Sequence, residues 1–151
     1  YQDRLQKLYD LMVWGSVAVA LPTTFLADWL IIILYGTEFK EAADVLRIYI
    51  WAGVFIFLGV ASFKWLVAEN LQHFSFYLYT IGSIVNIGCN WFLIPVYGIN
   101  GAAFATFVSY GIGSYGGFII FRKSRSNFLM ATQSFSPYGV YKRFADRELL
   151  K

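Results

Sequence analysis

The chain has 151 residues, of which only 14% are charged and 21% are aromatic. Soluble globular proteins carry about 25% charged residues, because their surface must present polar side chains to water. The composition therefore excludes an ordinary soluble domain and predicts an integral membrane protein. A single cysteine, Cys89, and a single histidine, His73, allow neither an internal disulfide nor a Cys/His zinc site, so we expect no metal and no cofactor.

The net charge is +3, and seven of the twelve Lys and Arg residues lie at or after Arg122. A basic chain can bind nucleic acid, but here the positive charge belongs to one terminal segment. Basic clusters beside a membrane span are typical of the cytoplasmic face. We therefore expect a basic cytoplasmic tail over 122–151 and no nucleic-acid partner.

In chain order, the first apolar stretch covers 11–34 and contains Pro22 and one acid, Asp28. It is long enough for a spanning helix, which needs about 20 apolar residues. The polar stretch that follows predicts a short amphipathic connector. A second spanning helix is expected over 45–67, with Arg47 and Lys64 near its two ends.

The segment 70–121 contains no Asp, Glu, Lys or Arg. It is too long for one spanning helix, and the residues around Pro95 and Gly98 break helices. We therefore expect two more spans, over 73–95 and 99–121. The predicted fold class is all-α: a polytopic transmembrane bundle of four helices over 1–121.

The placement of Lys and Arg predicts the orientation of these spans. With the basic tail in the cytoplasm, four spans also place the N-terminus, with Arg4 and Lys7, in the cytoplasm. Arg47 is the one exception to the rule, and its long side chain can extend to the outer interface. Arg47 and Lys64 lie roughly 26 Å apart along a helix, which favours an anchor at each interface over a functional role.

Three polar residues inside the spans are candidates for function. Asn86 and Asn90 share a helix face and must contact protein or water, because buried amides in lipid need partners. Their role is either interhelical hydrogen bonding, which we favour, or lining a polar cavity. Asp28 is an intramembrane acid, and its alternatives are a functional site, a local ion pair or a water-filled vestibule.

The last span carries a stripe of small residues spaced by four. Such stripes allow membrane helices to approach closely, so a packing role is favoured over a dinucleotide-binding loop. The stripe consists of Gly101, Ala105, Ser109, Gly113 and Gly117.

Three stretches of the sequence resemble the C-terminal region of bacterial polysaccharide flippases, the O-antigen and exopolysaccharide exporters of the MATE superfamily. The strongest match is 86–106, Asn86-Ile87-Gly88-Cys89-Asn90-Trp91-Phe92-Leu93-Ile94-Pro95-Val96-Tyr97-Gly98-Ile99-Asn100-Gly101-Ala102-Ala103-Phe104-Ala105-Thr106. The shorter matches are Leu34-Tyr35-Gly36-Thr37-Glu38-Phe39 and Ala42-Ala43-Asp44-Val45-Leu46-Arg47-Ile48. The resemblance does not extend to the tail.

The resemblance implies a transporter of two six-helix lobes, of which this chain would hold the last four helices; the start at Tyr1 rather than Met agrees with a fragment. It further implies movement of undecaprenyl-pyrophosphate-linked oligosaccharide across the bacterial inner membrane during polysaccharide or O-antigen (lipopolysaccharide) biosynthesis. The implied partners are the lipid bilayer, the lipid-linked oligosaccharide, the missing helices and glycan polymerases or glycosyltransferases. The residues proposed to contact substrate are Asp28, Arg47, Lys64, Asn86 and Asn90.

Two alternatives remain open at the level of sequence. One is a self-contained four-helix membrane protein that carries lipid-linked sugars, and the other is a scaffold subunit of a glycan-assembly complex. An enzyme is not expected, because the sequence offers no nucleophile–base pair and no acidic metal cluster.

Overall fold

The computed structural model describes residues 1–145, and its regular secondary structure over this range is entirely helical. The all-α prediction is confirmed. The α-helices are α1 (Gln2–Tyr35), α2 (Ala42–Ala68), α3 (His73–Ser114), α4 (Arg125–Ser134) and α5 (Pro137–Ala145). Short 3₁₀ helices connect them: η1 (Thr37–Phe39), η2 (Gly116–Ile119) and η3 (Arg122–Ser124).

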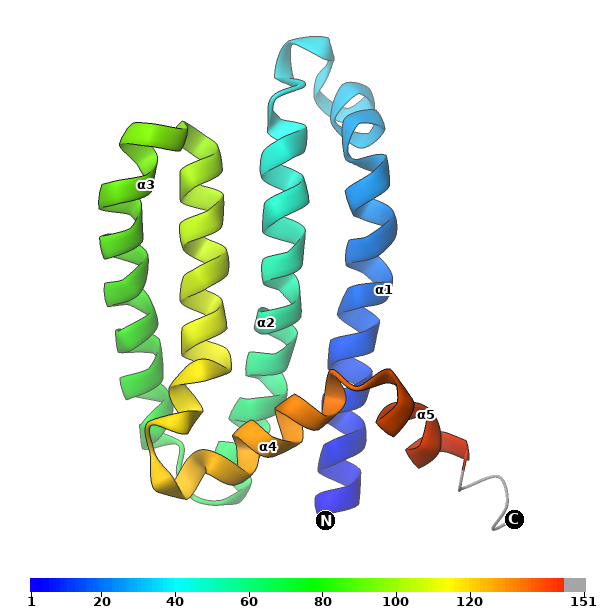
Figure 1. Cartoon of the computed structure of the whole chain (residues 1–151), viewed down its shortest axis with the longest axis vertical. Helices are drawn as coiled ribbons and strands as arrows, with labels where there is room; N and C mark the ends of the chain where they lie inside the picture. Colours follow the sequence, from blue (N-terminus) through cyan, green and yellow to red (C-terminus); the bar gives the residue numbers. More distant parts are fainter. Residues whose placement is uncertain (146–151) are drawn as a thin grey trace.

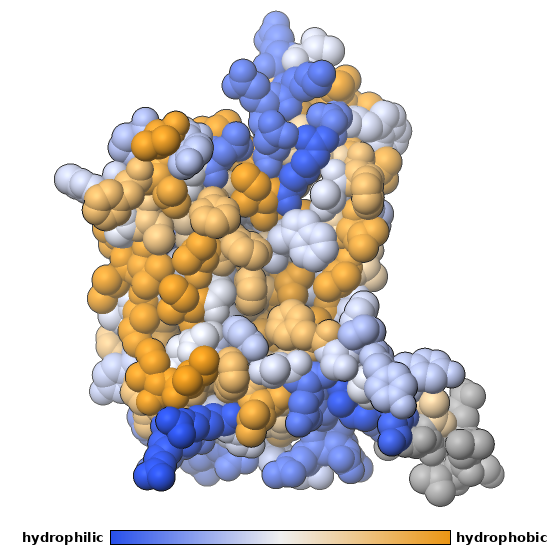
Figure 2. Space-filling model, in the orientation of Figure 1, coloured by the Kyte–Doolittle hydropathy of each residue, from blue (hydrophilic) through white to orange (hydrophobic). Residues whose placement is uncertain are grey.

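Three helical segments are long and apolar enough to cross a membrane: Gln2–Tyr35, Ala42–Ala68 and His73–Ile119. Figure 2 shows hydrophobic residues covering the middle of the molecule and hydrophilic residues gathered toward its two ends. Large apolar side chains are exposed along all three segments, which is the pattern of a surface that faces lipid rather than water. These features indicate a helical membrane protein.

Helix α1 begins at Gln2, well before the start of the span expected over 11–34. The added turns are helical because their apolar side chains have protein partners: Tyr9 is fully buried, and Leu5 and Leu8 pack against core clusters. Pro22 lies inside α1 without ending it. The hydroxyls of Thr23 and Thr24, which directly follow this proline, donate to the carbonyl oxygens of Val19 and Ala20 (both 2.7 Å).

Helix α3 is folded back on itself at Gly98, so that residues 73–97 and 99–114 form two antiparallel arms (Figure 1). Gly98 has φ 57° and ψ −133°, a conformation that is accessible to glycine and strained for other residues. At Gly101 a Cβ atom would lie 2.4 Å from the carbonyl oxygen of Leu93, so the turn also needs a glycine there. The fold-back lies within the turn expected over 95–101.

The second arm of α3 ends as an α-helix at Ser114 and continues as the 3₁₀ helix η2, rather than running to residue 121 as one helix. The change in geometry brings the backbone close to the first arm. A Cβ atom on Gly117 would lie 2.6 Å from Cδ2 of Leu78, and Phe118 is buried in a cluster with Trp65, Leu66 and Leu78. Burial of these side chains explains why the α-helix is not extended.

Helix α2 lies between α1 and α3, and the N-terminus lies at the same end of the bundle as α4 and α5 (Figure 1). The segment expected as a basic tail is therefore folded onto the bundle as far as residue 145. Helix α4 crosses under the bundle, and its Ala131 is buried in a core cluster with Tyr9 and Val13 of α1 and Leu58 of α2. Residues 146–151 of the expected tail lie outside the described residues.

Candidate functional site: a polar groove between the arms of α3

The two arms of α3 enclose an open groove of about 450 Å³, which we call the polar groove. Each arm contributes hydroxyl or amide side chains to its wall. The residues that line it are Tyr79, Gly82, Ser83, Asn86 and Ile87 from the first arm and Thr106, Ser109, Tyr110, Gly113 and Ser114 from the second. A polar wall is unusual on a chain whose outer surface is mostly apolar.

Small residues set the distance between the two arms. A Cβ atom on Gly82 would lie 3.2 Å from the carbonyl oxygen of Ser109, and one on Gly113 would lie 3.7 Å from Cα of Gly82. All five residues of the small-residue stripe, from Gly101 to Gly117, are buried. The structure thus places the stripe in the contact between the arms, with Ser109 and Gly113 also bordering the groove.

The two asparagines form one hydrogen-bonded chain at the groove. Nδ2 of Asn86 donates to Oγ of Ser109 across the arms (3.3 Å), and Nδ2 of Asn90 donates to Oδ1 of Asn86 (2.9 Å). Oδ1 of Asn90 is buried and has no hydrogen-bond partner among the described residues. Asn86 therefore combines the two roles considered for it, since it both bonds the arms together and lines the groove.

Lys64 lies beside the polar groove. It borders a second hollow of about 380 Å³ that shares Tyr79, Tyr110 and Ser114 with the groove. Its side chain is exposed, and within residues 1–145 it makes no ion pair. The close approach of α2 to the second arm depends on Gly59, where a Cβ atom would lie 2.8 Å from Oγ of Ser114.

Arg47 and Asp28 are brought together at the opposite end of α2, away from the groove. The Arg47 guanidinium pairs with the carboxylate of Asp28 and with that of Asp44 (2.7 Å), and its Nε donates to the carbonyl oxygen of Thr24 (3.3 Å). Of the alternatives for Asp28, this geometry matches the local ion pair. A guanidinium that already faces two carboxylates has little free positive charge to offer an anionic ligand.

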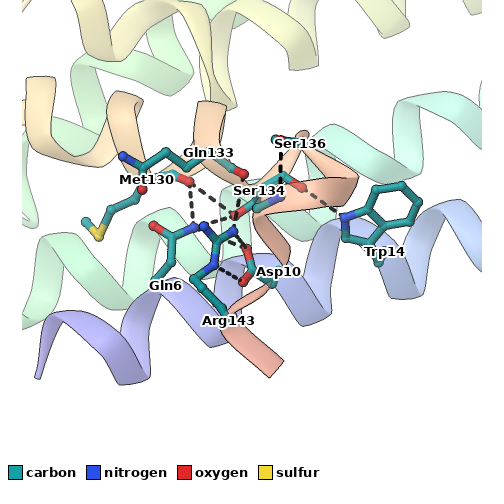
Figure 3. A network of polar contacts seen from close by, with 9 residues as sticks. Gln6, Asp10, Trp14, Met130, Gln133, Ser134, Ser136 and Arg143 are labelled. Carbon is teal, nitrogen blue, oxygen red and sulfur yellow. Dashed lines mark hydrogen bonds and ion pairs between the residues drawn. The ribbon is translucent and has the colours of Figure 1, made fainter. Parts of the chain in front are cut away.

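A second polar cluster joins the C-terminal helices to α1 (Figure 3). The carboxylate of Asp10, whose side chain is fully buried, accepts two hydrogen bonds from Arg143 of α5, each 2.8 Å long. Nε2 of Gln6 donates to the same carboxylate and to Oγ of Ser134 (2.8 Å), and Nε1 of Trp14 donates to the carbonyl oxygen of Ser134 (2.9 Å). We call this arrangement the tail clamp.

A third set of polar contacts buries Asn127 of α4 beneath the bundle. The Tyr9 hydroxyl donates to Oδ1 of Asn127 (2.5 Å), and the Ser62 hydroxyl donates to the same oxygen (3.3 Å). These contacts join α4 to both α1 and α2. They have the character of structural bonds, because every group involved lies in the packed interior.

The sequence singled out Asn86, which lines the groove, and Asn90 and Lys64, which lie beside it, whereas most of the groove and all of the tail clamp were missed. The first-arm residues Tyr79, Ser83 and Asn86 recur at helical spacing, so this polar face was readable in the sequence. On the second arm, Thr106 and Ser109 lie among small residues, so the sequence pattern predicts helix packing there rather than a polar face. The tail clamp joins residues at opposite ends of the chain, and no local pattern signals such a pair.

The groove offers hydroxyl and amide groups as hydrogen-bond donors and acceptors. Hydroxyl and amide side chains bind neutral polar groups such as sugar hydroxyls, and a lysine binds an anion as a point charge. Within residues 1–145 no three His, Cys, Asp or Glu side chains gather as a metal site. Comparisons of the chain with protein-family models, with curated proteins and with solved structures give no match.

Proposed function

We propose that this chain is part of a membrane transporter of the polysaccharide flippase type, which moves an undecaprenyl-pyrophosphate-linked oligosaccharide across the bacterial inner membrane. The observation that carries the proposal is the polar groove in an otherwise apolar helical surface. Polar side chains inside a membrane are disfavoured unless they face protein or water, so a polar groove there marks a path for a polar solute. The resemblance of 86–106 to the flippases supplies the substrate class.

The proposal includes four membrane crossings, one by each arm of α3 and one each by α1 and α2, with both ends of the chain in the cytoplasm. Residues 73–97 would span roughly 37 Å at the helical rise, enough to cross a bilayer. Asn86 would lie roughly 20 Å along this arm from His73, near the middle of the membrane. The basic residues after the last crossing support the cytoplasmic assignment, and they include Arg122, Lys123 and Arg125.

In this proposal the residues of the groove have distinct roles. Asn86, Ser109 and Tyr110 would hydrogen-bond sugar hydroxyls, and Lys64 would contact the pyrophosphate through charge-assisted hydrogen bonds. The lipid tail would stay in the bilayer beside the exposed apolar faces. Arg47 and Asp28 would hold α1 to α2 instead of binding substrate.

Export of the lipid-linked glycan by the complete transporter tests this division. We expect Lys64→Gln to reduce export about tenfold or more, since loss of one charge-assisted contact corresponds to roughly 1.5–3 kcal/mol, whereas Lys64→Arg should retain most activity. Substrate flipping is measured in proteoliposomes at matched protein levels.

Arg47→Gln is the matched control for this experiment, because it removes a cation from the same helix outside the groove. We expect its effect to fall on stability, and export per folded molecule should stay near the native value. Normal export by Lys64→Gln would refute the assigned role of Lys64. Loss of export per folded molecule in Arg47→Gln would place the cationic site at the other end of α2.

A further inference from the structure

Helix α5 is amphipathic, and its apolar side points away from the protein. Tyr138, Tyr141 and Phe144 recur at a spacing of three residues, so they share one side of the helix. Their exposed fractions are 76%, 73% and 48%. Aromatic side chains of this size are normally turned toward a protein core, so their exposure needs a reason.

The opposite side of α5 is the one that faces the bundle. Arg143 lies on this side and is fixed by the tail clamp to Asp10 of α1. Gly139 lies close to Arg143, since a Cβ atom on Gly139 would be 3.4 Å from Nη1 of Arg143. In a water-soluble protein an amphipathic helix packs with the reverse orientation, apolar side inward.

The position of α5 and the exposed cations of the C-terminal segment indicate what covers the aromatic side. Helix α5 projects sideways from the end of the bundle that holds the N-terminus, beside α1, which is long and apolar enough to cross a membrane (Figure 1). With α1 across a bilayer, this level would lie among the lipid headgroups, where tyrosine is enriched in membrane proteins. Four exposed cations belong to the same C-terminal segment: Arg122, Lys123, Arg125 and Lys142.

We propose that α5 is an interfacial helix that lies in the headgroup layer and binds anionic phospholipid. Its aromatic side inserts at the boundary between headgroups and acyl chains, and the four cations contact the negatively charged headgroups. The tail clamp fixes this short helix to α1. The helix is therefore already held beside the membrane surface before it contacts lipid. The proposal concerns the C-terminal segment alone and does not depend on the transport function.

An environment-sensitive nitrobenzoxadiazole label on a single cysteine tests the proposal in the full chain. The label is placed at Tyr141→Cys in a Cys89→Ala background, and the protein is reconstituted in vesicles of phosphatidylcholine with or without phosphatidylglycerol. We expect blue-shifted emission and quenching by a shallow spin-labelled lipid when phosphatidylglycerol is present. A label at Gln133→Cys is the control, because Gln133 borders a polar hollow with Gln2 and Asp3 and should report water.

Charge dependence provides the second readout. Because each Lys or Arg near an anionic surface contributes about 1 kcal/mol, Lys142→Gln should lower the ratio of lipid-contacting to water-exposed label at position 141 by roughly fivefold. Water-like emission from position 141 in both lipid mixtures would overturn the proposal. So would lipid contact that is equal in the two mixtures, or a blue shift in detergent that grows with protein concentration, which would assign the aromatic side to a second copy of the chain.

Discussion

Replacing Arg143 with leucine is expected to destabilise the fold by about 3 kcal/mol, because it leaves the Asp10 carboxylate buried without its cation. The side chain of Asp10 is fully buried, whereas that of Arg143 is 28% exposed, so we expect the lower end of the usual range. Gln6 would remain as one hydrogen-bond donor to the carboxylate. The free energy of unfolding in detergent micelles measures the effect.

Two further variants separate the ion pair from other effects of the substitution. Lys142→Leu changes a neighbouring exposed cation that makes no ion pair among the described residues, and it should be nearly neutral. The double variant Asp10→Asn with Arg143→Leu should recover much of the lost stability, since a neutral amide is easier to bury than an unpaired carboxylate. Equal stability of Arg143→Leu and Lys142→Leu would show that the tail clamp contributes nothing.

The second large effect is expected at the turn of α3. Gly101→Ala would place Cβ 2.4 Å from the carbonyl oxygen and 2.6 Å from the carbonyl carbon of Leu93, and backbone atoms cannot move aside as a side chain can. We expect a loss of about 3 kcal/mol, at the upper end of the range for overpacking, together with separation of the two arms. Unfolding in detergent and a distance measurement between spin labels on the arms report the two effects.

Gly88→Ala is the matched control for the turn. Gly88 lies on the first arm and is exposed, and a Cβ atom added there would meet nothing within 4 Å. The substitution should be neutral or stabilise the helix by up to about 1 kcal/mol, because alanine has the higher helix propensity. If both alanine variants behave alike, the close approach at Gly101 is not what holds the turn.

The sequence predicted the helical elements well because their signals are local. Long apolar stretches predicted the long helices, and Pro95 with Gly98 predicted the turn at which α3 folds back. The small-residue stripe was readable for the same reason, since its spacing lies within one helix. The helix ends were less predictable, because η2 and the first turns of α1 depend on burial of Phe118 and Tyr9 by distant segments.

The candidate site was predictable only in part. Asn86 and Asn90 stood out because amides are rare in an apolar span, and Lys64 because it is charged. Which cation lies beside the groove could not be predicted, since Arg47 and Lys64 look alike in sequence. In the structure the two cations differ because the Arg47 guanidinium is paired with the carboxylates of Asp28 and Asp44. The pair with Asp28 forms only when α1 packs against α2.

The central claim is that the polar groove holds water at membrane depth, and two adjacent cysteines test it. Ser83 lines the groove, while Ile84 is 64% exposed on the outer apolar surface. In a Cys89→Ala background and in isolated membranes, we predict that Ser83→Cys reacts with a charged methanethiosulfonate reagent and that Ile84→Cys does not, because thiolates form in water and not in lipid. Reaction of Ile84→Cys with protection of Ser83→Cys would contradict the claim.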